Sequence, residues 1–159
     1  MKKTSVMFLA GIITGILISL GLVFLLAPKL MFSVSESKYD FATTKALIEK
    51  ATPENKWSMP HQYDLQATMK KHGFDVKAVT VYSICKPDIA VKILGADDNR
   101  HISAMMPCRI AIYEKADGKT YIARMNAGLL AKLLGNEVNA VMGDAETGSE
   151  KILEQVIKK

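Results

Sequence analysis

Residues 108–125 read CRIAIYEKADGKTYIARM, and this segment decides the fold. From residue 108 to 115, Ile110, Ile112 and Glu114 alternate with Arg109, Ala111 and Tyr113, as in a β-strand. Residues 119–125 form a second run that is rich in β-forming residues. The Asp117-Gly118 pair between the runs is typical of a hairpin turn, because glycine adopts a positive φ without a Cβ clash. We therefore predict two antiparallel strands joined by a tight turn.

Another strand is predicted upstream, over residues 76–85, where valine, threonine and tyrosine are enriched. Pro87 closes it, because proline cannot donate a ladder hydrogen bond. Cys85 then lies at the exit of this strand and Cys108 at the entry of the next one. If the two strands are antiparallel, both sulfur atoms lie at the same end of the sheet. A parallel crossover would place them at opposite ends.

The remaining elements are predicted from apolar spacing, capping residues and breakers. A linker is expected from residue 30, followed by strands near residues 32–37 and 57–63. Helices are expected over residues 40–50, 64–73, 87–95 and 126–135 and from residue 149 onward, with a polar loop over 96–103. Thr52-Pro53 is expected to stop the first helix, because proline disfavours helical backbone in the residue before it.

The N-terminal segment predicts a membrane anchor. Residues 6–27 carry no charge, and as a helix they would span ~33 Å, enough for the hydrocarbon core of a bilayer. A cleaved signal peptide would have a shorter apolar region that ends at a small-x-small site. Here Leu25, Leu26 and Ala27 are followed directly by Pro28, which makes a poor cleavage site. We expect an uncleaved signal anchor over residues 1–29, followed by one domain over residues 30–159.

The short basic tail before the anchor resembles an export signal. It predicts a single-pass protein of the cytoplasmic (inner) membrane, with the C-terminal domain on the periplasmic or extracytoplasmic side. Lysines on the far side of the anchor offset Lys2 and Lys3, so the charge count alone does not set the orientation. Gly11, Gly15 and Ser19 recur every fourth residue, a spacing that lets membrane helices approach closely, although glycine is also simply common in such helices.

The net charge of +5 arises mostly at the N-terminus. Residues 1–29 hold three of the 21 Lys and Arg residues and none of the 16 Asp and Glu residues, which leaves 18 basic against 16 acidic side chains in the domain. A phosphate-binding surface needs a concentrated excess of positive charge. We therefore expect no nucleic acid among the partners.

Several motifs resemble those of a known family: Cys-Lys-Pro-Asp-Ile-Ala at 85–90, Met-Pro-Cys-Arg-Ile at 106–110, Tyr113-Glu114, Asp117-Gly118-Lys119 and Met125-Asn126. From residue 33 to the C-terminus the chain resembles the family called domain of unknown function 302. The resemblance implies an α+β domain of TATA-binding-protein-like architecture, with a curved antiparallel sheet, flanking helices and a tendency to form homo-oligomers, in particular dimers. It implies no activity. Many members lack the two cysteines, which therefore look like a subgroup feature.

Cys85 and Cys108 are the main candidate site, and three interpretations are open. They form a structural disulfide in an oxidising compartment, where closing the loop would stabilise the fold by roughly 3 kcal/mol. Or they form a redox dithiol or a soft-metal site, because Met105 and Met106 flank Cys108, and thiolate with thioether ligands suits Cu(I). Or they are two inert buried thiols. The spacing lacks the close Cys-x-x-Cys pair of a structural zinc site.

His101 and Arg109 are weaker candidates beside the cysteines. His101 could complete a Cys/Met/His ligand set, and Arg109 would lower the pKa of a neighbouring thiol if it faced the sulfur, although such residues more often face solvent. The sequence contains no G-x-S-x-G motif, no P-loop and no informative pair of carboxylates. We therefore expect a non-enzymatic, membrane-anchored module that binds an unknown ligand or partner. A thiol or copper site is the alternative.

Overall fold

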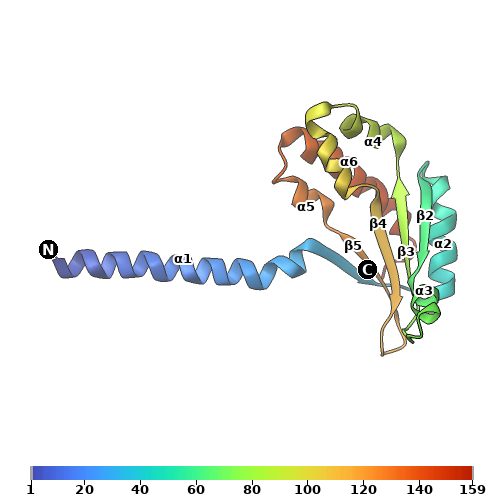
Figure 1. Cartoon of the computed structure of the whole chain (residues 1–159), viewed down its shortest axis with the longest axis horizontal. Coiled ribbons are helices and arrows are strands. Elements are labelled where there is room, and N and C mark those ends of the chain that lie inside the picture. Colours follow the sequence, from blue (N-terminus) through green and yellow to red (C-terminus); the bar gives the residue numbers. More distant parts are fainter. Residues whose placement is uncertain (1, 159) are drawn as a thin grey trace.

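A five-stranded antiparallel sheet organises the domain, in the order β1-β5-β4-β3-β2. The computed structural model describes residues 2–158, and the side chains of these residues apart from 2–6 and 10. The strands are β1 Phe32–Glu36, β2 Ser58–Asp64, β3 Val79–Cys85, β4 Cys108–Glu114 and β5 Thr120–Met125. With helices flanking this sheet (Figure 1), the predicted α+β class is confirmed.

The predicted hairpin is confirmed as β4 and β5. Gly118 has a φ of +75°, and the carboxylate of Asp117 accepts the backbone N–H of Lys119 at 3.0 Å within the turn. β3 pairs with β4 in the antiparallel sense, which places Ile84 opposite Cys108. The antiparallel alternative therefore holds, and the two cysteines lie at the same end of the sheet.

The helices are α1 Lys2–Met31, α2 Phe41–Glu54, α3 Leu65–Lys71, α4 Pro87–Leu94, the 3-10 helix η1 Asp97–Met105, α5 Ala127–Ala131 and α6 Asn136–Leu153. Three predicted N-caps are confirmed. The side chains of Asp40, Asp64 and Asn126 each accept a backbone N–H from the first turn of α2, α3 and α5. These bonds satisfy donors that the start of a helix otherwise leaves unpaired.

The expected stop of α2 before Pro53 is wrong, because the helix continues to Glu54. A proline so close to the helix end removes only one backbone donor, and the neighbouring Thr52 hydroxyl donates to the Ile48 carbonyl at 2.7 Å. The chain leaves the helical conformation at Lys56, which has a φ of 61°.

The expected start of the last helix at residue 149 is also wrong, because α6 begins at Asn136. Val138, Val141 and Ala145 recur at helical spacing and are buried, but the intervening glycines mask this pattern in the sequence. Packing explains why residue 148 is glycine, since a Cβ there would lie 2.9 Å from the Trp57 ring. Glycine thus lets the indole pack directly on the helix.

Two connections are more ordered than predicted. The expected linker from residue 30 is absent, because α1 runs to Met31 and β1 starts at Phe32. The expected loop over residues 96–103 is the 3-10 helix η1, in which Ile102 is buried. Both α1 and η1 are therefore joined to the sheet by short connections.

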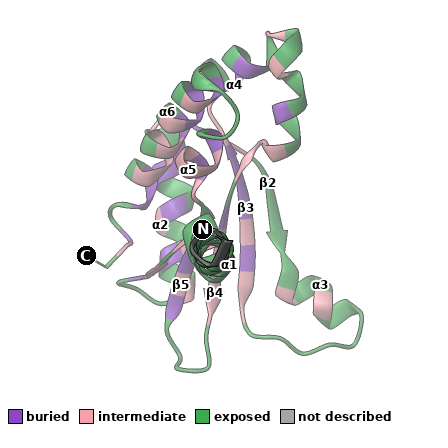
Figure 2. Cartoon of the chain, turned by 90° about the vertical axis from the view of Figure 1, so that its left-hand side faces the viewer, coloured by how far each residue is buried: buried purple, intermediate pink, exposed green. Residues whose placement is uncertain are grey.

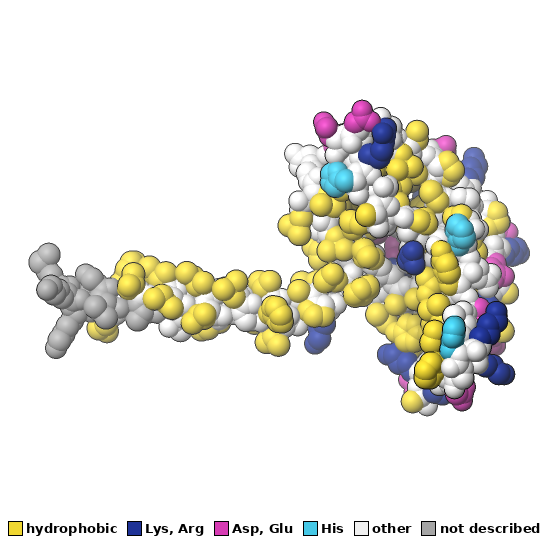
Figure 3. Space-filling view, viewed as in Figure 1, with side chains coloured by type: hydrophobic (Ala, Val, Ile, Leu, Met, Phe, Trp, Pro, Cys, Tyr) yellow, Lys and Arg dark blue, Asp and Glu magenta, His cyan; other side chains and the backbone are white. Residues whose placement is uncertain are grey.

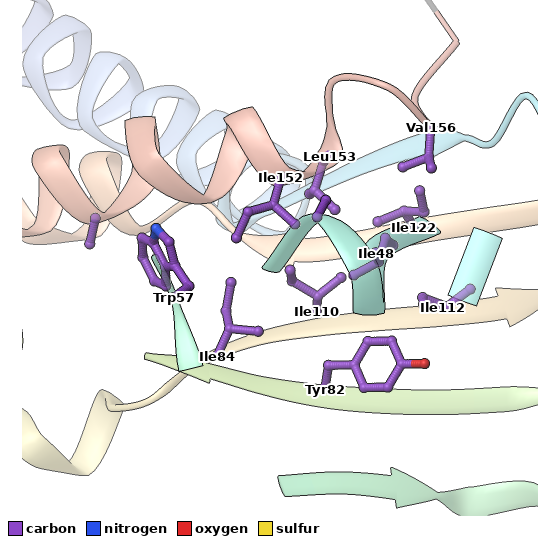
Figure 4. Close-up of a cluster of buried hydrophobic side chains, with 12 residues drawn as sticks. Ile48, Trp57, Tyr82, Ile84, Ile110, Ile112, Ile122, Ile152, Leu153 and Val156 are labelled. Carbon is purple, nitrogen blue, oxygen red and sulfur yellow. The ribbon is translucent and has the colours of Figure 1, made fainter. Parts of the chain in front are cut away.

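The main hydrophobic core lies between α2, α6 and one face of the sheet, called here the covered face. Its sheet residues are at most 1% exposed: Tyr82, Ile84, Ile110, Ile112 and Ile122. Figure 4 shows how they meet the side chains from the two helices: Ile48, Ile152 and Leu153. A second cluster joins α4, η1, α5 and α6 at one end of the domain. Figure 2 shows buried residues on the strands as well as on the helices.

α1 leaves the domain on the side of the sheet opposite α2. Figure 1 places α1 and α2 on opposite sides of the strands, and in Figure 2 α1 points toward the viewer in front of them. By length and composition, Met7–Met31 could cross a membrane. The backbone N–H of Asn126 donates to the Met31 carbonyl at 2.9 Å and ties the end of α1 to the start of α5. The side chains of Lys2 and Lys3 lie outside the described part.

Candidate functional site

The face of the sheet that points away from α2 and α6, called here the uncovered face, carries transverse rows of side chains. Strand register sets the rows: Phe32, Met125, Arg109, Ser83 and His61; then Val34, Ala123, Ala111, Val81 and Tyr63; then Glu36, Tyr121, Tyr113 and Val79. Side chains alternate across a strand, so these residues point away from the core. All except Ser83 are partly or fully exposed.

A groove with a volume of about 390 Å³ is lined by residues of this face and also by residues of α6, among them Met142 and Glu146. Its floor includes Ala111 and Ala123, which pair directly across β4 and β5. In the strand register these two alanines lie between the row that contains Phe32 and Met125, which line the groove, and the row that contains Tyr113 and Tyr121. Residues of η1 and α5 also line the groove. The volume lies within the range of small-molecule sites, roughly 300–1,000 Å³.

Tyrosine rings lie on the same face as the groove, which Arg109 and Arg124 line. Tyr113 and Tyr121 stack with their ring centroids 5.9 Å apart. On the other side the Arg109 guanidinium lies 5.6 Å from the centroid of the Tyr63 ring, within the range of a cation–π contact. The uncovered face therefore combines an apolar floor with a positive charge at its rim.

The carboxylates that line the groove are already engaged. Glu150 makes a two-pronged ion pair with Arg124, at 2.5 and 2.8 Å, and Glu146 accepts the backbone N–H of Gly128 at 2.9 Å. Among the residues that the structure describes, Arg109 has no carboxylate within ion-pair distance. Its charge is available to a ligand.

A second hollow contains both cysteines. Cys85 and Cys108, from the adjacent ends of β3 and β4, line an apolar cavity of about 30 Å³. Met106 and Met142 line it too, so four sulfur-bearing side chains surround one small space. A cavity of this size has room for about one water-sized or metal-sized guest.

The electrostatics of this cavity disfavour a reactive thiol. Burial raises the pKa of the Cys85 thiol, and burial followed by the nearby Cys85 raises the pKa of Cys108. Cys85 and Cys108 are free thiols in this structure and do not form a disulfide. A raised pKa keeps a thiol protonated at neutral pH, whereas catalytic cysteines have depressed pKa values.

The other candidates from the sequence lie elsewhere. His101 is exposed on η1, with its Nδ1 atom 2.9 Å from the Asp98 carbonyl, and it does not line the cysteine cavity. Met105 and Arg109 line the groove on the uncovered face. Among the described residues, no group of three or more His, Cys, Asp or Glu side chains is arranged so that it could hold a metal ion. The structure thus brings Cys85, Cys108 and Met106 together at the cysteine cavity, and Met106 and Cys108 also line the groove with Met105 and Arg109.

Sequence reasoning missed several residues of both hollows. Met142 lies on α6, far from the cysteines in sequence. Because the last helix was expected to start only at residue 149, the sequence did not place Met142 on it. Ala111 and Ala123 carry no chemical signal of their own. Their pairing in the predicted hairpin was the signal that could have suggested a hollow in the sheet.

Comparison with known proteins identifies the family. Residues 33–158 match the family described as "Domain of unknown function DUF302", and the chain belongs to this family. One similar solved structure is described as "Crystal structure of uncharacterized conserved protein DUF302 from Bacillus stearothermophilus". The TM-score is 0.71 with 16% identity, over 79% of this chain and 98% of that chain, so the likeness concerns the fold alone. No curated protein matches the sequence.

Proposed function

We propose that the protein is a membrane-anchored binding module that holds an amphipathic ligand, apolar with an acidic group, in the groove of its uncovered face. The observation that carries this proposal is the pairing of Ala111 with Ala123 below a rim that contains Arg109. The apolar floor would take the hydrocarbon part of the ligand, and the unpaired guanidinium would bind its carboxylate. No catalytic step is part of this function.

The anchor is proposed to be α1, in the cytoplasmic (inner) membrane, with the domain on the periplasmic or extracytoplasmic side. Its support is the apolar length of Met7–Met31 and the short basic tail before it. Since α1 leaves on the side of the uncovered face, the groove would face the bilayer (Figure 1). An amphipathic ligand partitions into that bilayer, so the orientation suits the proposed chemistry.

We also propose that the protein forms homo-oligomers through α1 rather than through the sheet. Two domains docked by their uncovered faces would direct their α1 helices in opposite directions, which does not suit one membrane. Gly11 and Gly15 lie on α1 with no side chain of the same chain within 4 Å of an added Cβ, so a second helix could approach there. Crosslinking in membranes should detect the dimer, and Gly15→Leu should reduce it. Equal crosslinking of both proteins would contradict this route.

A dansylated long-chain fatty acid tests the groove, with its methyl ester as an uncharged control. The full chain in nanodiscs should bind the acid, and Ala111→Leu should abolish binding because the larger side chain fills the hollow. Ala116→Leu adds the same side chain in the exposed hairpin turn and should bind like the wild type. If Ala111→Leu and Ala116→Leu bind equally, the groove is not the site.

Arg109→Gln separates charge recognition from apolar binding. A hydrogen bond to a charged group contributes about 1.5–3 kcal/mol, so affinity for the acid should fall about tenfold to hundredfold. Affinity for the methyl ester should stay the same, because the ester carries no negative charge for the guanidinium. An equal loss for both ligands would mean that Arg109 acts by packing and not by charge.

A second candidate function is a soft-metal or thiol redox site, favoured by the cavity that Cys85 and Cys108 share with Met106 and Met142. Thiolate and thioether ligands in an apolar space suit Cu(I), which needs few ligands and little water. Cu(I) titration should show one site that Met106→Leu weakens. Met105→Leu is the matched control, because Met105 lines the groove instead. Equal effects of the two variants, or no binding, would exclude the cavity as the copper site.

A further inference from the structure

Exposed leucines form a corner of the domain beside the end of α1. This leucine corner consists of the exposed Leu133 and Leu134 in the connection to α6, with the half-buried Leu130 of α5 beside them in the chain. Leu133 is 85% exposed, which equals the exposure of Phe24 in the candidate membrane span. Figure 3 shows hydrophobic side chains gathered on the part of the domain nearest α1. Exposed leucines in a part of the domain that also gathers other hydrophobic side chains indicate an interaction surface.

The position of the leucine corner is fixed relative to α1. α5 contacts α1, and the hydrogen bond from Asn126 N–H to the Met31 carbonyl joins the two elements at 2.9 Å. In Figure 1 the α5 side of the domain lies level with the end of α1. If α1 crosses a bilayer, its last turn reaches the interface, and the leucine corner reaches the same depth.

Charge at this level of the molecule fits a phospholipid surface. Lys29 in the last turn of α1 and Lys132 beside Leu133 are both exposed and basic. Lysines next to apolar side chains are typical of segments that lie in a membrane interface, where the stem stays apolar and the ammonium group meets lipid head groups. The acidic Glu137 nearby accepts a hydrogen bond from Asn99 of η1 at 3.1 Å.

We infer that the leucine corner inserts into the interface of the same bilayer that α1 crosses, so that the domain lies on the membrane at two points. This inference rests on the proposed anchoring by α1. Two contacts fix the tilt of the domain, whereas a single helix would leave it free to rotate. The uncovered face is then held toward the lipid, and the groove can take its ligand from the bilayer without passage through water.

Quenching by lipids that are brominated near the head-group end of the acyl chain tests the inference on the full chain in vesicles. Leu133→Trp places an indole at the corner, while the buried Trp57 provides an internal marker of folding in every variant. Phe74→Trp is the matched control, because Phe74 is 63% exposed in the connection after α3, away from α1. Val23→Trp reports separately on the insertion of α1.

The corner inserts if the added fluorescence of Leu133→Trp is mostly lost while that of Phe74→Trp is unchanged. If Val23→Trp is quenched but Leu133→Trp behaves like Phe74→Trp, the leucine corner does not enter the membrane and the inference is overturned, while the anchor stands. If Val23→Trp is also unquenched, both the anchor and the inference are overturned.

Discussion

The covered face of the sheet consists of large side chains that solvent does not reach, whereas the uncovered face centres on two alanines between exposed aromatic and charged residues. Tyr82 and Ile112 on the covered face are completely buried, while Val34 on the uncovered face is 51% exposed. The same five strands thus hold the fold together on one side and carry the proposed binding surface on the other. Substitutions on the two faces should affect different properties.

The largest expected effect is on the covered face. Ile110→Ala removes a side chain that is 1% exposed, and the lost burial with the remaining cavity should cost about 2–5 kcal/mol of unfolding free energy. Val34→Ala on the uncovered face should change it by less than about 1 kcal/mol, because the side chain is already half in solvent. Urea unfolding of the full chain in detergent measures both. Similar losses would show that both faces are buried in the working protein.

A pair of glycines on α6 tests how tightly the covered face is packed. Gly148→Ala places a methyl group against the Trp57 ring, and this overpacking should lower the unfolding free energy by about 1–3 kcal/mol. Gly143→Ala is the matched control, because a Cβ there meets nothing within 4 Å. It should stabilise the protein by about 0.5–1 kcal/mol through helix propensity. If both alanine variants are more stable, the indole does not pack on Gly148 in solution.

The thiols of Cys85 and Cys108 lie at the end of the sheet, and they should be alkylated slowly. Because burial raises their pKa values, the fraction of thiolate at a given pH is smaller than for an unperturbed cysteine, and alkylation should accelerate only at higher pH. Mass spectrometry of iodoacetamide-treated protein across a pH series measures this. Cys108, whose pKa is raised by two causes, should react more slowly than Cys85. Rapid alkylation at neutral pH would favour a redox dithiol.

The hairpin and the N-caps could be predicted because they depend on local patterns. Asp117-Gly118 sets its own turn, and Asp40 and Asp64 cap helices that start one residue later. The family resemblance covered the same region and predicted the α+β class. These features need no information from distant parts of the chain.

The groove could not be predicted from the sequence, because it depends on which face of the sheet the helices cover. Valines such as Val34 and Val81 are as apolar as core residues, so the sequence does not distinguish the faces. The glycines in α6 hid the helix that decides the question. The cysteine cavity was predicted only in part, since Met142 joins it through tertiary packing. Long-range packing, and not local propensity, places both hollows.

The smallest expected effect concerns Glu36 at the edge of the uncovered face. Its carboxylate binds Lys158 at 2.5 Å and Lys119 at 3.2 Å, and thereby joins β1 to the hairpin and to the C-terminus. Hydrogen bonds to Lys158 and Lys119 hold the pKa of Glu36 below its ordinary value.

A lowered carboxyl pKa contributes stability that is present above the unfolded pKa and is lost as the pH falls through the folded pKa. Glu36→Gln should therefore lower the urea midpoint slightly at neutral pH, and the difference from the wild type should vanish in acid. Glu36→Gln combined with Lys158→Gln should cost less than the sum of the single changes, because the two residues interact. A difference that stays constant across pH would mean that Glu36 stabilises β1 by packing and not by its charge.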